Sequence, residues 1–122
     1  MFMGKVNELI VYQKAYLLAM DVFHLSKGFP QDEKYGLISQ IRRSSRSVCS
    51  NIAEGYRKRL YRAHFISKLT DADMENTETG VWIEFAFSCG YIDDHSKVRL
   101  IAQTEEIGKL LYFMINNPNK FS

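Results

Sequence analysis

The fold is decided by the stretch from about Arg62 to Cys89, which reads RAHFISKLTDADMENTETGVWIEFAFSC. Along it, one set of residues recurs at alternating spacings of four and three, the period of a helix that packs against other helices. The members of this seam are Phe65, Leu69, Ala72, Asn76, Thr79, Ile83 and Ala86, widened by Trp82 and Phe85. The stretch therefore predicts one long helix with a buried seam, and Gly90 is expected to end it.

Turn-forming residues divide the rest of the chain into three more helices. With the long stretch included, the expected helices cover about residues 6–26, 32–56, 62–89 and 94–116. Both prolines, Pro30 and Pro118, fall outside these ranges, because proline clashes with the preceding helical turn and lacks a backbone donor. Helices joined by short loops pack as antiparallel neighbours. The sequence predicts an all-α, antiparallel up-down-up-down four-helix bundle that forms a single domain over residues 1–122.

Particular residues are expected to end the helices and to form their buried faces. Gly28 in the left-handed conformation ends the first helix, while carboxylates of Asp32 and of Asp93 or Asp94 cap the second and fourth. On the first helix, the residues expected to point inward are Leu9, Tyr12, Tyr16, Met20 and Phe23. On the second they are Leu37, Ile38, Ile41, Val48 and Ile52. On the fourth they are Val98, Ile101, Ile107, Leu111, Met114 and Ile115.

Positive charge is concentrated in the middle of the chain. The net charge is only +2, yet residues 42–62 contain seven basic residues against one acidic residue. A segment this basic favours contact with a polyanion or an acidic protein surface, and it would bind phosphates without reading a base sequence. The candidate nucleic-acid-binding residues are Arg42, Arg43, Arg46, Arg57, Lys58, Arg59 and Arg62. We expect the first three to share one face of the second helix.

A polar stripe lies beside the apolar face of the second helix. Its short side chains repeat at spacings of four and three, and an acidic face on the third helix offers them partners. Two interpretations are open: a solvated face, or a hydrogen-bonded seam within the bundle or between protomers. The candidate seam or oligomer residues are Gln40, Ser44, Ser47, Asn51, Glu54, Glu75 and Glu78.

No set of residues indicates catalysis, a cofactor or a metal. The chain has no P-loop, no dinucleotide fingerprint, no paired Cys-x-x-Cys, and no pair of Glu-x-x-His motifs for a di-metal site. Cys49 and Cys89 are expected to be small buried hydrophobic residues. Arg59 and His64 have the Arg-x4-His spacing that looks like the motif of the HEPN ribonucleases. We expect a protein that is not an enzyme, with ribonuclease action at this pair as an alternative.

Neither a membrane span nor a leader peptide is evident. No apolar run approaches the roughly 20 residues that cross a bilayer. The first residues lack the apolar stretch and small-residue cleavage site of a secretory signal. A cytoplasmic location is the expectation.

Several strings of residues are similar to the signature of a known family. They are Phe29-Pro30, Glu33, Tyr35-Gly36-Leu37, Gln40-Ile41-Arg42-Arg43, Ser47-Val48 and Asn51-Ile52-Ala53-Glu54-Gly55, followed by Arg57. On these residues the chain resembles the four helix bundle protein family, also called 23S-rRNA intervening-sequence proteins. The resemblance implies a bundle that assembles into a ring, typically a homopentamer. The family is similar to the accessory proteins of diversity-generating retroelements, which bind nucleic acid and a reverse transcriptase.

Three functions are therefore open. The first is a non-enzymatic homo-oligomer, pentameric by the resemblance, whose basic segment contacts RNA, DNA or a nucleic-acid enzyme similar to a reverse transcriptase. The second is a purely structural module, in which the arginines pair with acidic residues of the third helix and contact no nucleic acid. The third is the ribonuclease.

Overall fold

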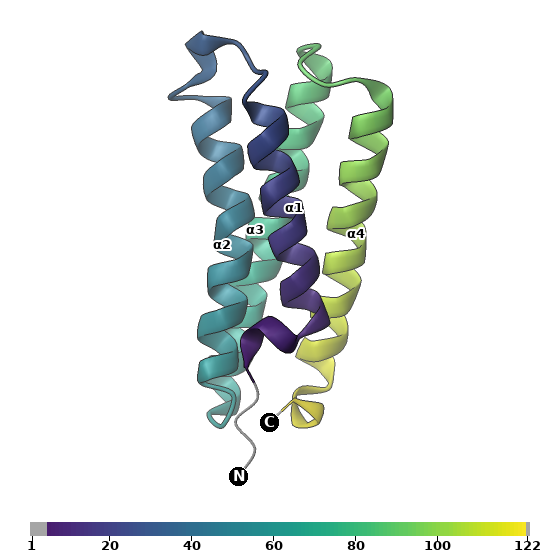
Figure 1. Ribbon diagram of the computed structural model, residues 1–122. Coiled ribbons are helices and arrows are strands. Elements are labelled where there is room, and N and C mark those ends of the chain that lie inside the picture. Colours follow the sequence, from purple (N-terminus) through teal and green to yellow (C-terminus); the bar gives the residue numbers. More distant parts are fainter. Residues whose placement is uncertain (1–4, 122) are drawn as a thin grey trace.

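The computed structural model describes residues 5–121, and these residues form four long helices with no strand among them. The long helices are α1 (Ile10–Ser26), α2 (Leu37–Arg57), α3 (Arg62–Ser88) and α4 (Asp94–Asn116). Three short 3-10 helices flank them: η1 (Val6–Glu8), η2 (Gln31–Glu33) and η3 (Pro118–Lys120). Consecutive long helices run in opposite directions, as the ribbon in Figure 1 shows. The predicted four-helix bundle is confirmed.

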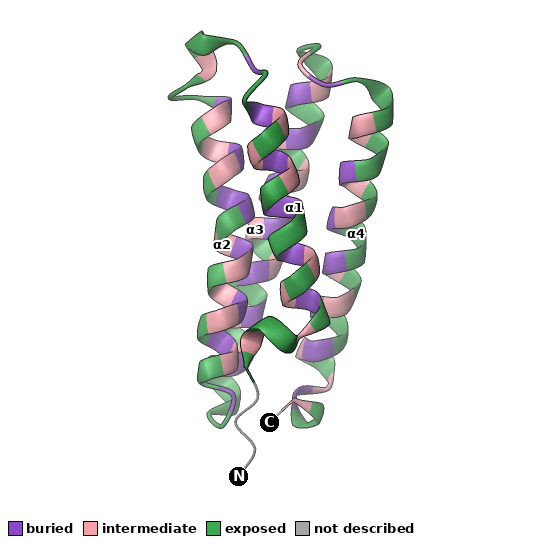
Figure 2. Cartoon of the chain, in the orientation of Figure 1, coloured by how far each residue is buried: buried purple, intermediate pink, exposed green. Residues whose placement is uncertain are grey.

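The predicted seam of α3 forms one wall of the core. Every seam residue from Phe65 to Ala86 is buried, and Asn76 is the most accessible of them at 4%. The buried residues of all four helices face the centre of the bundle in Figure 2. The α2–α3 interface is the most extensive in the bundle, and the α1–α4 interface is the least extensive of those between neighbouring long helices. The strict heptad of α3 thus faces the core while the helix packs against both α2 and α4.

The buried face of α1 differs from the predicted one. Tyr16 is 53% exposed and Met20 is 38% exposed, whereas the residues that point inward are smaller. The buried residues of α1 are Val11, Ala15, Leu18, Ala19, Val22 and Ser26. Tyr16 and Met20 lie at the rim of the helix instead. Because α1 is apolar on several faces, periodicity alone did not choose between them.

Two other predicted inward positions are also wrong. Val98 on α4 is 58% exposed and Phe85 on α3 is 53% exposed. Leu100 and Thr104 take the inward positions on the first half of α4. On α4 the buried face is shifted by about two residues, whereas on α3 the predicted seam holds and Phe85 lies outside it.

The start of α2 lies five residues later than predicted, and its cap is a different carboxylate. Asp32 belongs to the short helix η2, and α2 begins at Leu37 after Gly36. Glu33 Oε1 accepts a hydrogen bond of 3.1 Å from the backbone N–H of Leu37. Its other oxygen accepts a 2.8 Å hydrogen bond from the Tyr91 hydroxyl, which ties the α1–α2 loop to the α3–α4 loop.

Two glycines end helices in different ways. Gly90 has a φ of 77° and ends α3 as predicted, with the backbone N–H of Tyr91 bonded to the carbonyl of Ala86 at 2.9 Å. Gly28 does not adopt a positive φ, so its predicted left-handed conformation is wrong. Its N–H instead bonds to the carbonyl of Leu25 in a tight 3-10-like turn. The Asp93 carboxylate caps α4 as expected, accepting from the N–H of Ser96 at 2.7 Å.

Candidate nucleic-acid interface

The basic segment does not form one patch, because α2 presents its arginines to different neighbours. Arg43 points toward α3, whereas Arg42 and Arg46 lie over a ring of α1. The remaining four cations lie at the turn between α2 and α3. The prediction that Arg42, Arg43 and Arg46 share a face is wrong, since successive residues of a helix point about 100° apart. Residues three or four positions apart are neighbours on a helix surface, and here Arg46 lies with Arg42 over α1 rather than with Arg43 toward α3.

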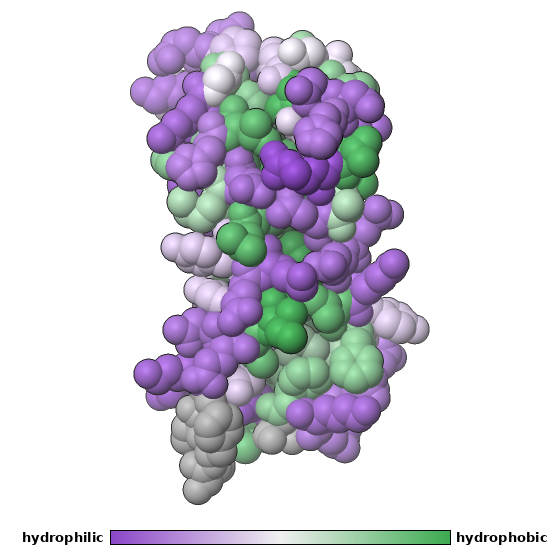
Figure 3. Space-filling model, turned by 45° about the vertical axis from the view of Figure 1, so that its right-hand side comes forward, coloured by the Kyte–Doolittle hydropathy of each residue, from purple (hydrophilic) through white to green (hydrophobic). Residues whose placement is uncertain are grey.

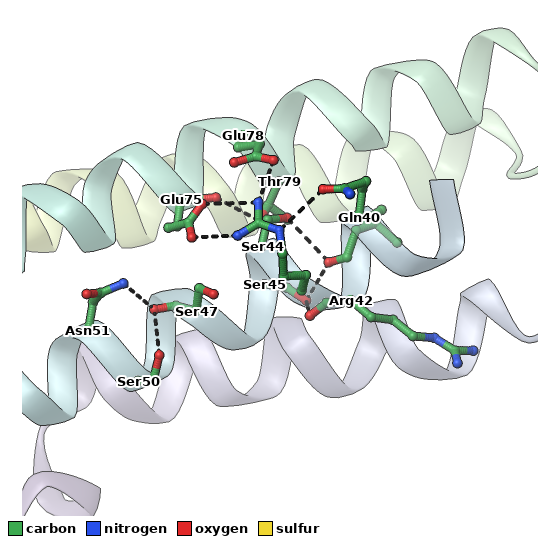
Figure 4. Close-up of polar contacts among 12 residues, drawn as sticks. Gln40, Arg42, Ser44, Ser45, Ser47, Ser50, Asn51, Glu75, Glu78 and Thr79 are labelled. Atoms are coloured by element: carbon green, nitrogen blue, oxygen red, sulfur yellow. Dashed lines mark hydrogen bonds and ion pairs between the residues drawn. The ribbon is translucent and has the colours of Figure 1, made fainter. Parts of the chain in front are cut away.

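Arg43 is neutralised by two carboxylates of α3. Its Nη1 donates to Glu75 Oε2 at 2.8 Å and its Nη2 donates to Glu78 Oε1 at 2.6 Å. The same Glu78 oxygen accepts a hydrogen bond of 3.1 Å from the Trp82 indole. These contacts hold the pKa of Glu78 below its ordinary value, chiefly through the hydrogen bond from Arg43. Figure 4 shows Glu75 and Glu78 with their polar contacts. The predicted pairing of α2 with the acidic face of α3 is therefore present at Arg43.

One residue of the polar stripe lies in a buried seam. Ser44 and Thr79 are both fully buried, and their hydroxyl oxygens are 2.8 Å apart across the α2–α3 interface. Thr79 Oγ1 also lies 2.9 Å from the carbonyl oxygen of Glu75.

The rest of the stripe lies at the rim. Asn51 and Ser47 are half-buried, and the Asn51 amide bonds back to the Ser47 carbonyl at 2.9 Å. Gln40 is half-buried and accepts a weak bond of 3.3 Å from Arg43, while Glu54 is exposed and pairs with Lys68 at 3.5 Å. The stripe is thus a hydrogen-bonded seam at its centre and a hydrated face toward its ends.

The groove beside this stripe has the wrong charge for phosphate. A cavity of about 350 Å³ lies between α2 and α3. Its lining residues are Asn51, Asp71, Met74, Glu75 and Glu78. Three carboxylates around an open groove make this side of the bundle unfavourable for a polyanion.

The turn between α2 and α3 carries a group of neighbouring cations. We refer to Arg57, Lys58, Arg59 and Arg62 as the basic end. Arg57, Lys58 and Arg62 are exposed, and among the described residues none of these three has an ion-pair partner. Exposed cations without a carboxylate beside them keep their full charge available to a ligand.

Arg59 differs from the other members of the basic end. Its side chain is largely buried, because its guanidinium lies 4.1 Å from the centre of the Tyr56 ring and donates to the Tyr56 carbonyl at 2.9 Å. His64 is exposed, with its ring edge-on to Tyr61 at 6.3 Å. Within residues 5–121, no described contact joins Arg59 to His64. Arg59 therefore stabilises the turn, and its positive charge lies just beneath the surface of the basic end.

Gly55 sets the position of the basic end. A Cβ at this residue would lie 2.9 Å from Lys68 Cβ and 3.5 Å from the carbonyl oxygen of Phe65. The last turn of α2 and the first turns of α3 therefore approach closely, which fixes the short connection that displays Lys58. Both termini of the described chain lie at the end of the bundle that carries the α2–α3 turn, as Figure 1 shows. Lys5 and Lys120, which are both exposed, therefore lie at the same end of the bundle as that turn.

Among residues 5–121, no three histidine, cysteine or acidic side chains are grouped so as to hold a metal ion. Over the same residues, the helices are too short or too polar to span a bilayer. Cys49 is half-buried, and burial raises the pKa of its thiol to about 11. Cys89 is exposed at the end of α3, so its predicted burial is wrong.

Comparison with known proteins identifies the family. Residues 7–113 match the family described as 23S rRNA-intervening sequence protein. A crystal structure from Bacteroides thetaiotaomicron, described as a protein with unknown function from the S23 ribosomal protein family, is 31% identical with a TM-score of 0.79. The similarity covers 88% of this chain and 96% of that one. A search of the curated proteins gave no match. The chain belongs to the 23S rRNA-intervening sequence protein family.

Proposed function

We propose that this chain is a cytoplasmic, non-enzymatic and homo-oligomeric bundle protein whose basic end binds the phosphate backbone of a nucleic acid. One observation carries the proposal: Arg57, Lys58 and Arg62 are exposed at one turn and have no ion pair among the described residues. Arg43, by contrast, already has two carboxylate partners. Cations that are free to neutralise phosphates displace the counterions condensed on a nucleic acid, and this release drives binding.

The surroundings of the basic end fit a phosphate backbone rather than a base-reading interface. Tyr61 is 66% exposed beside Arg62, and an exposed aromatic ring can stack on an unpaired base. The nearest acidic residue of α2, Glu54, is occupied by Lys68. The expected binding is therefore electrostatic, tolerant of sequence and steeply dependent on salt.

Self-association is supported by exposed apolar side chains on the α1–α4 side. Ile10 is 61% exposed, Leu17 is 59% exposed and Phe113 is 44% exposed. A cavity of about 320 Å³ opens between Ile10 and Phe113. Figure 3 shows hydrophobic patches on this face, separated by hydrophilic side chains. A ring of copies, for which the family resemblance favours a pentamer, would cover part of this surface and repeat the basic end around its axis.

A purely structural role is the second candidate, and one observation favours it. Arg43 is held by Glu75 and Glu78 on the neighbouring helix, as expected if the arginines served only the bundle. The two candidates differ at the basic end, where the structural role predicts no effect of charge on any nucleic acid.

The test compares two variants of equal charge. Fluorescence anisotropy with a labelled structured RNA and a labelled duplex DNA measures binding to the purified protein. We expect the triple substitution Arg57→Glu, Lys58→Glu and Arg62→Glu to abolish binding. The control triple carries the same change at Lys34, Lys97 and Lys109, and it should bind within a few fold of the unaltered protein. Equal loss in both triples, or no loss in either, would refute the basic end as the interface.

The oligomer is tested separately. Light scattering coupled to size exclusion should report a single assembly larger than the 14.2 kDa chain. Ile10→Asp with Leu17→Asp should shift it toward the monomer, because a charge buried in an apolar contact is costly. A monomer in the unaltered protein would contradict the homo-oligomer.

A further inference from the structure

One aromatic ring of α1 is surrounded by cations from two helices. The centre of the Phe23 ring lies 4.6 Å from Lys27 Nζ, 4.8 Å from Arg42 Cζ and 5.8 Å from Arg46 Cζ. Lys27 follows the end of α1, whereas the two arginines come from successive turns of α2. The three charges are therefore within about one Debye length of each other, so they repel one another unless an anion is present.

A buried hydroxyl fixes the orientation of Arg42. The Nε of Arg42 donates to Ser26 Oγ at 2.8 Å, and the Ser26 side chain is completely buried. The Ser26 hydroxyl in turn donates to the carbonyl of Phe23 at 3.0 Å. Figure 4 shows Arg42 extending away from the network that holds Glu75 and Glu78. With Nε bound and the guanidinium over the ring, the two Nη groups remain as a fork with no partner among the described residues.

Among residues 5–121, no carboxylate forms an ion pair with Lys27, Arg42 or Arg46. Helices α1 and α2 contain one acidic residue each, Asp21 and Glu54. Asp21 accepts hydrogen bonds from Arg99 at 2.9 Å and Gln103 at 3.2 Å, both on α4. Glu54 pairs with Lys68 on α3. Both carboxylates are thus directed to the other helices, and the α1–α2 side retains three positive charges without a counter-ion among the described residues.

We propose that Lys27, Arg42 and Arg46, arranged around Phe23, form a binding site for a phosphoryl group. A guanidinium stacked on a ring leaves its N–H edges free in the plane, where they donate to anionic oxygens. A phosphate monoester carries nearly two negative charges and three acceptor oxygens, which matches three cationic donors better than the single charge of a carboxylate does. Phe23 is the platform of the site, and Ser26 is a positioning residue that acts through Arg42.

This site is separate from the basic end. Arg46 and Arg57 are eleven residues apart on α2, which corresponds to about 16 Å along the helix axis. The same chemistry is offered by a free phosphate or mononucleotide and by the terminal phosphate of an RNA. The proposal does not depend on nucleic-acid binding at the basic end, and the two are tested with different variants.

The test uses inorganic phosphate on the full chain at constant ionic strength. Titration followed by nuclear magnetic resonance of the arginine Nε–H groups should show saturable shifts at Arg42, and acetate should give at most a tenth of the affinity. Arg42→Gln with Arg46→Gln should weaken phosphate binding at least tenfold. Phe23→Leu, which keeps every cation, should weaken it severalfold and serves as the second variant if the first fails to fold. Arg57→Gln with Arg62→Gln is the control and should leave phosphate affinity within twofold.

A matched pair of RNA hexamers, one with a 5′-phosphate and one with a 5′-hydroxyl, distinguishes the sources. Preference for the phosphorylated hexamer that disappears in Arg42→Gln with Arg46→Gln supports a terminal RNA phosphate. Binding of free phosphate without such a preference supports a small phosphorylated ligand. The proposal is overturned if phosphate gives no saturable shift at Arg42, if acetate binds as tightly as phosphate, or if the Arg42 and Arg46 variant binds phosphate normally.

Discussion

Arg43 and Glu78 face each other across the α2–α3 interface, with Nη2 of the arginine 2.6 Å from Oε1 of the glutamate. Glu75 holds the other arm of the same guanidinium at 2.8 Å. One arginine therefore connects two carboxylates that would otherwise repel each other on one face of α3. Arg43 therefore contributes to the packing of the bundle, whereas the exposed cations of the basic end have no ion pair among the described residues.

Arg43→Ala should destabilise the bundle by about 1 kcal/mol. Both ends of the ion pair are partly exposed, which limits the value of the pair itself, but its loss also leaves Glu75 and Glu78 unscreened. Urea unfolding followed by circular dichroism measures the change. Nucleic-acid affinity should be unaffected, because Arg43 is not part of the basic end. A loss of binding larger than that of the basic-end variant would contradict the division of roles.

The lowered pKa of Glu78 predicts a loss of stability in acid. Its pKa is lower in the folded chain than in the unfolded chain, so the ionised carboxylate stabilises the fold above its unfolded value of about 4.3. That contribution is lost as pH falls through the folded pKa. Between about pH 6 and pH 3, the unaltered protein should lose more unfolding free energy than Glu78→Gln does. Parallel pH profiles from urea titrations would show that the Arg43 contact is not linked to protonation.

The buried hydroxyl pair predicts coupling between Ser44 and Thr79. Either Ser44→Ala or Thr79→Val leaves a buried hydroxyl with a poorer partner, at a cost of about 1–3 kcal/mol. The double substitution removes both hydroxyls and should cost less than the sum of the two single changes. A double-mutant cycle measured by urea unfolding should give a coupling of about 1 kcal/mol. Additive changes would mean that the 2.8 Å contact contributes no stability.

Two glycines of the bundle should respond oppositely to alanine. Gly55→Ala places a methyl group 2.9 Å from Lys68 Cβ, so α2 and α3 must separate and stability should fall by about 1–3 kcal/mol. Gly80→Ala meets nothing closer than Thr104 Oγ1 at 3.9 Å and should gain up to about 1 kcal/mol from helix propensity. Melting temperatures of the two variants should therefore move in opposite directions. A rise for Gly55→Ala would show that the approach of the helices at the basic end is loose.

The two thiols should react at different rates with a water-soluble disulfide reagent. Cys89 is exposed, whereas Cys49 is half-buried and its pKa of about 11 leaves little thiolate near neutral pH. Absorbance should show one fast equivalent from Cys89 and a second that waits for unfolding. Cys89→Ser should remove the fast phase, and Cys49→Ser should leave it.

The sequence correctly predicted the buried face of a helix where its apolar pattern allows only one such face. The seam of α3 from Phe65 to Ala86 keeps strict spacings of four and three along the whole helix, and all of its residues are buried. On α1 apolar residues occur all round, and the choice of Ala15 over Tyr16 as the inward residue depended on how closely the neighbouring helices approach. Gly36 directly precedes the first residue of α2, so the helix begins later than predicted and Asp32 does not cap it.

The site was less predictable than the fold, because charge counts ignore direction. Arg42 and Arg43 are adjacent in sequence, yet one stacks on Phe23 of α1 and the other binds Glu75 and Glu78 of α3. The cluster around Phe23 was not predicted, although the spacing of four between Arg42 and Arg46 was a signal that they share a face. Which helix covers that face is a property of the packed bundle.

The salt dependence of nucleic-acid binding tests the central claim most directly. The logarithm of the affinity for duplex DNA is measured against the logarithm of salt concentration, for the unaltered protein and for Arg57→Ala with Lys58→Ala and Arg62→Ala. Each lost phosphate contact should reduce the slope by about 0.9, so the variant's line should be shallower by two to three such steps. Identical slopes for the two proteins, or no salt dependence at all, would contradict a phosphate-binding basic end.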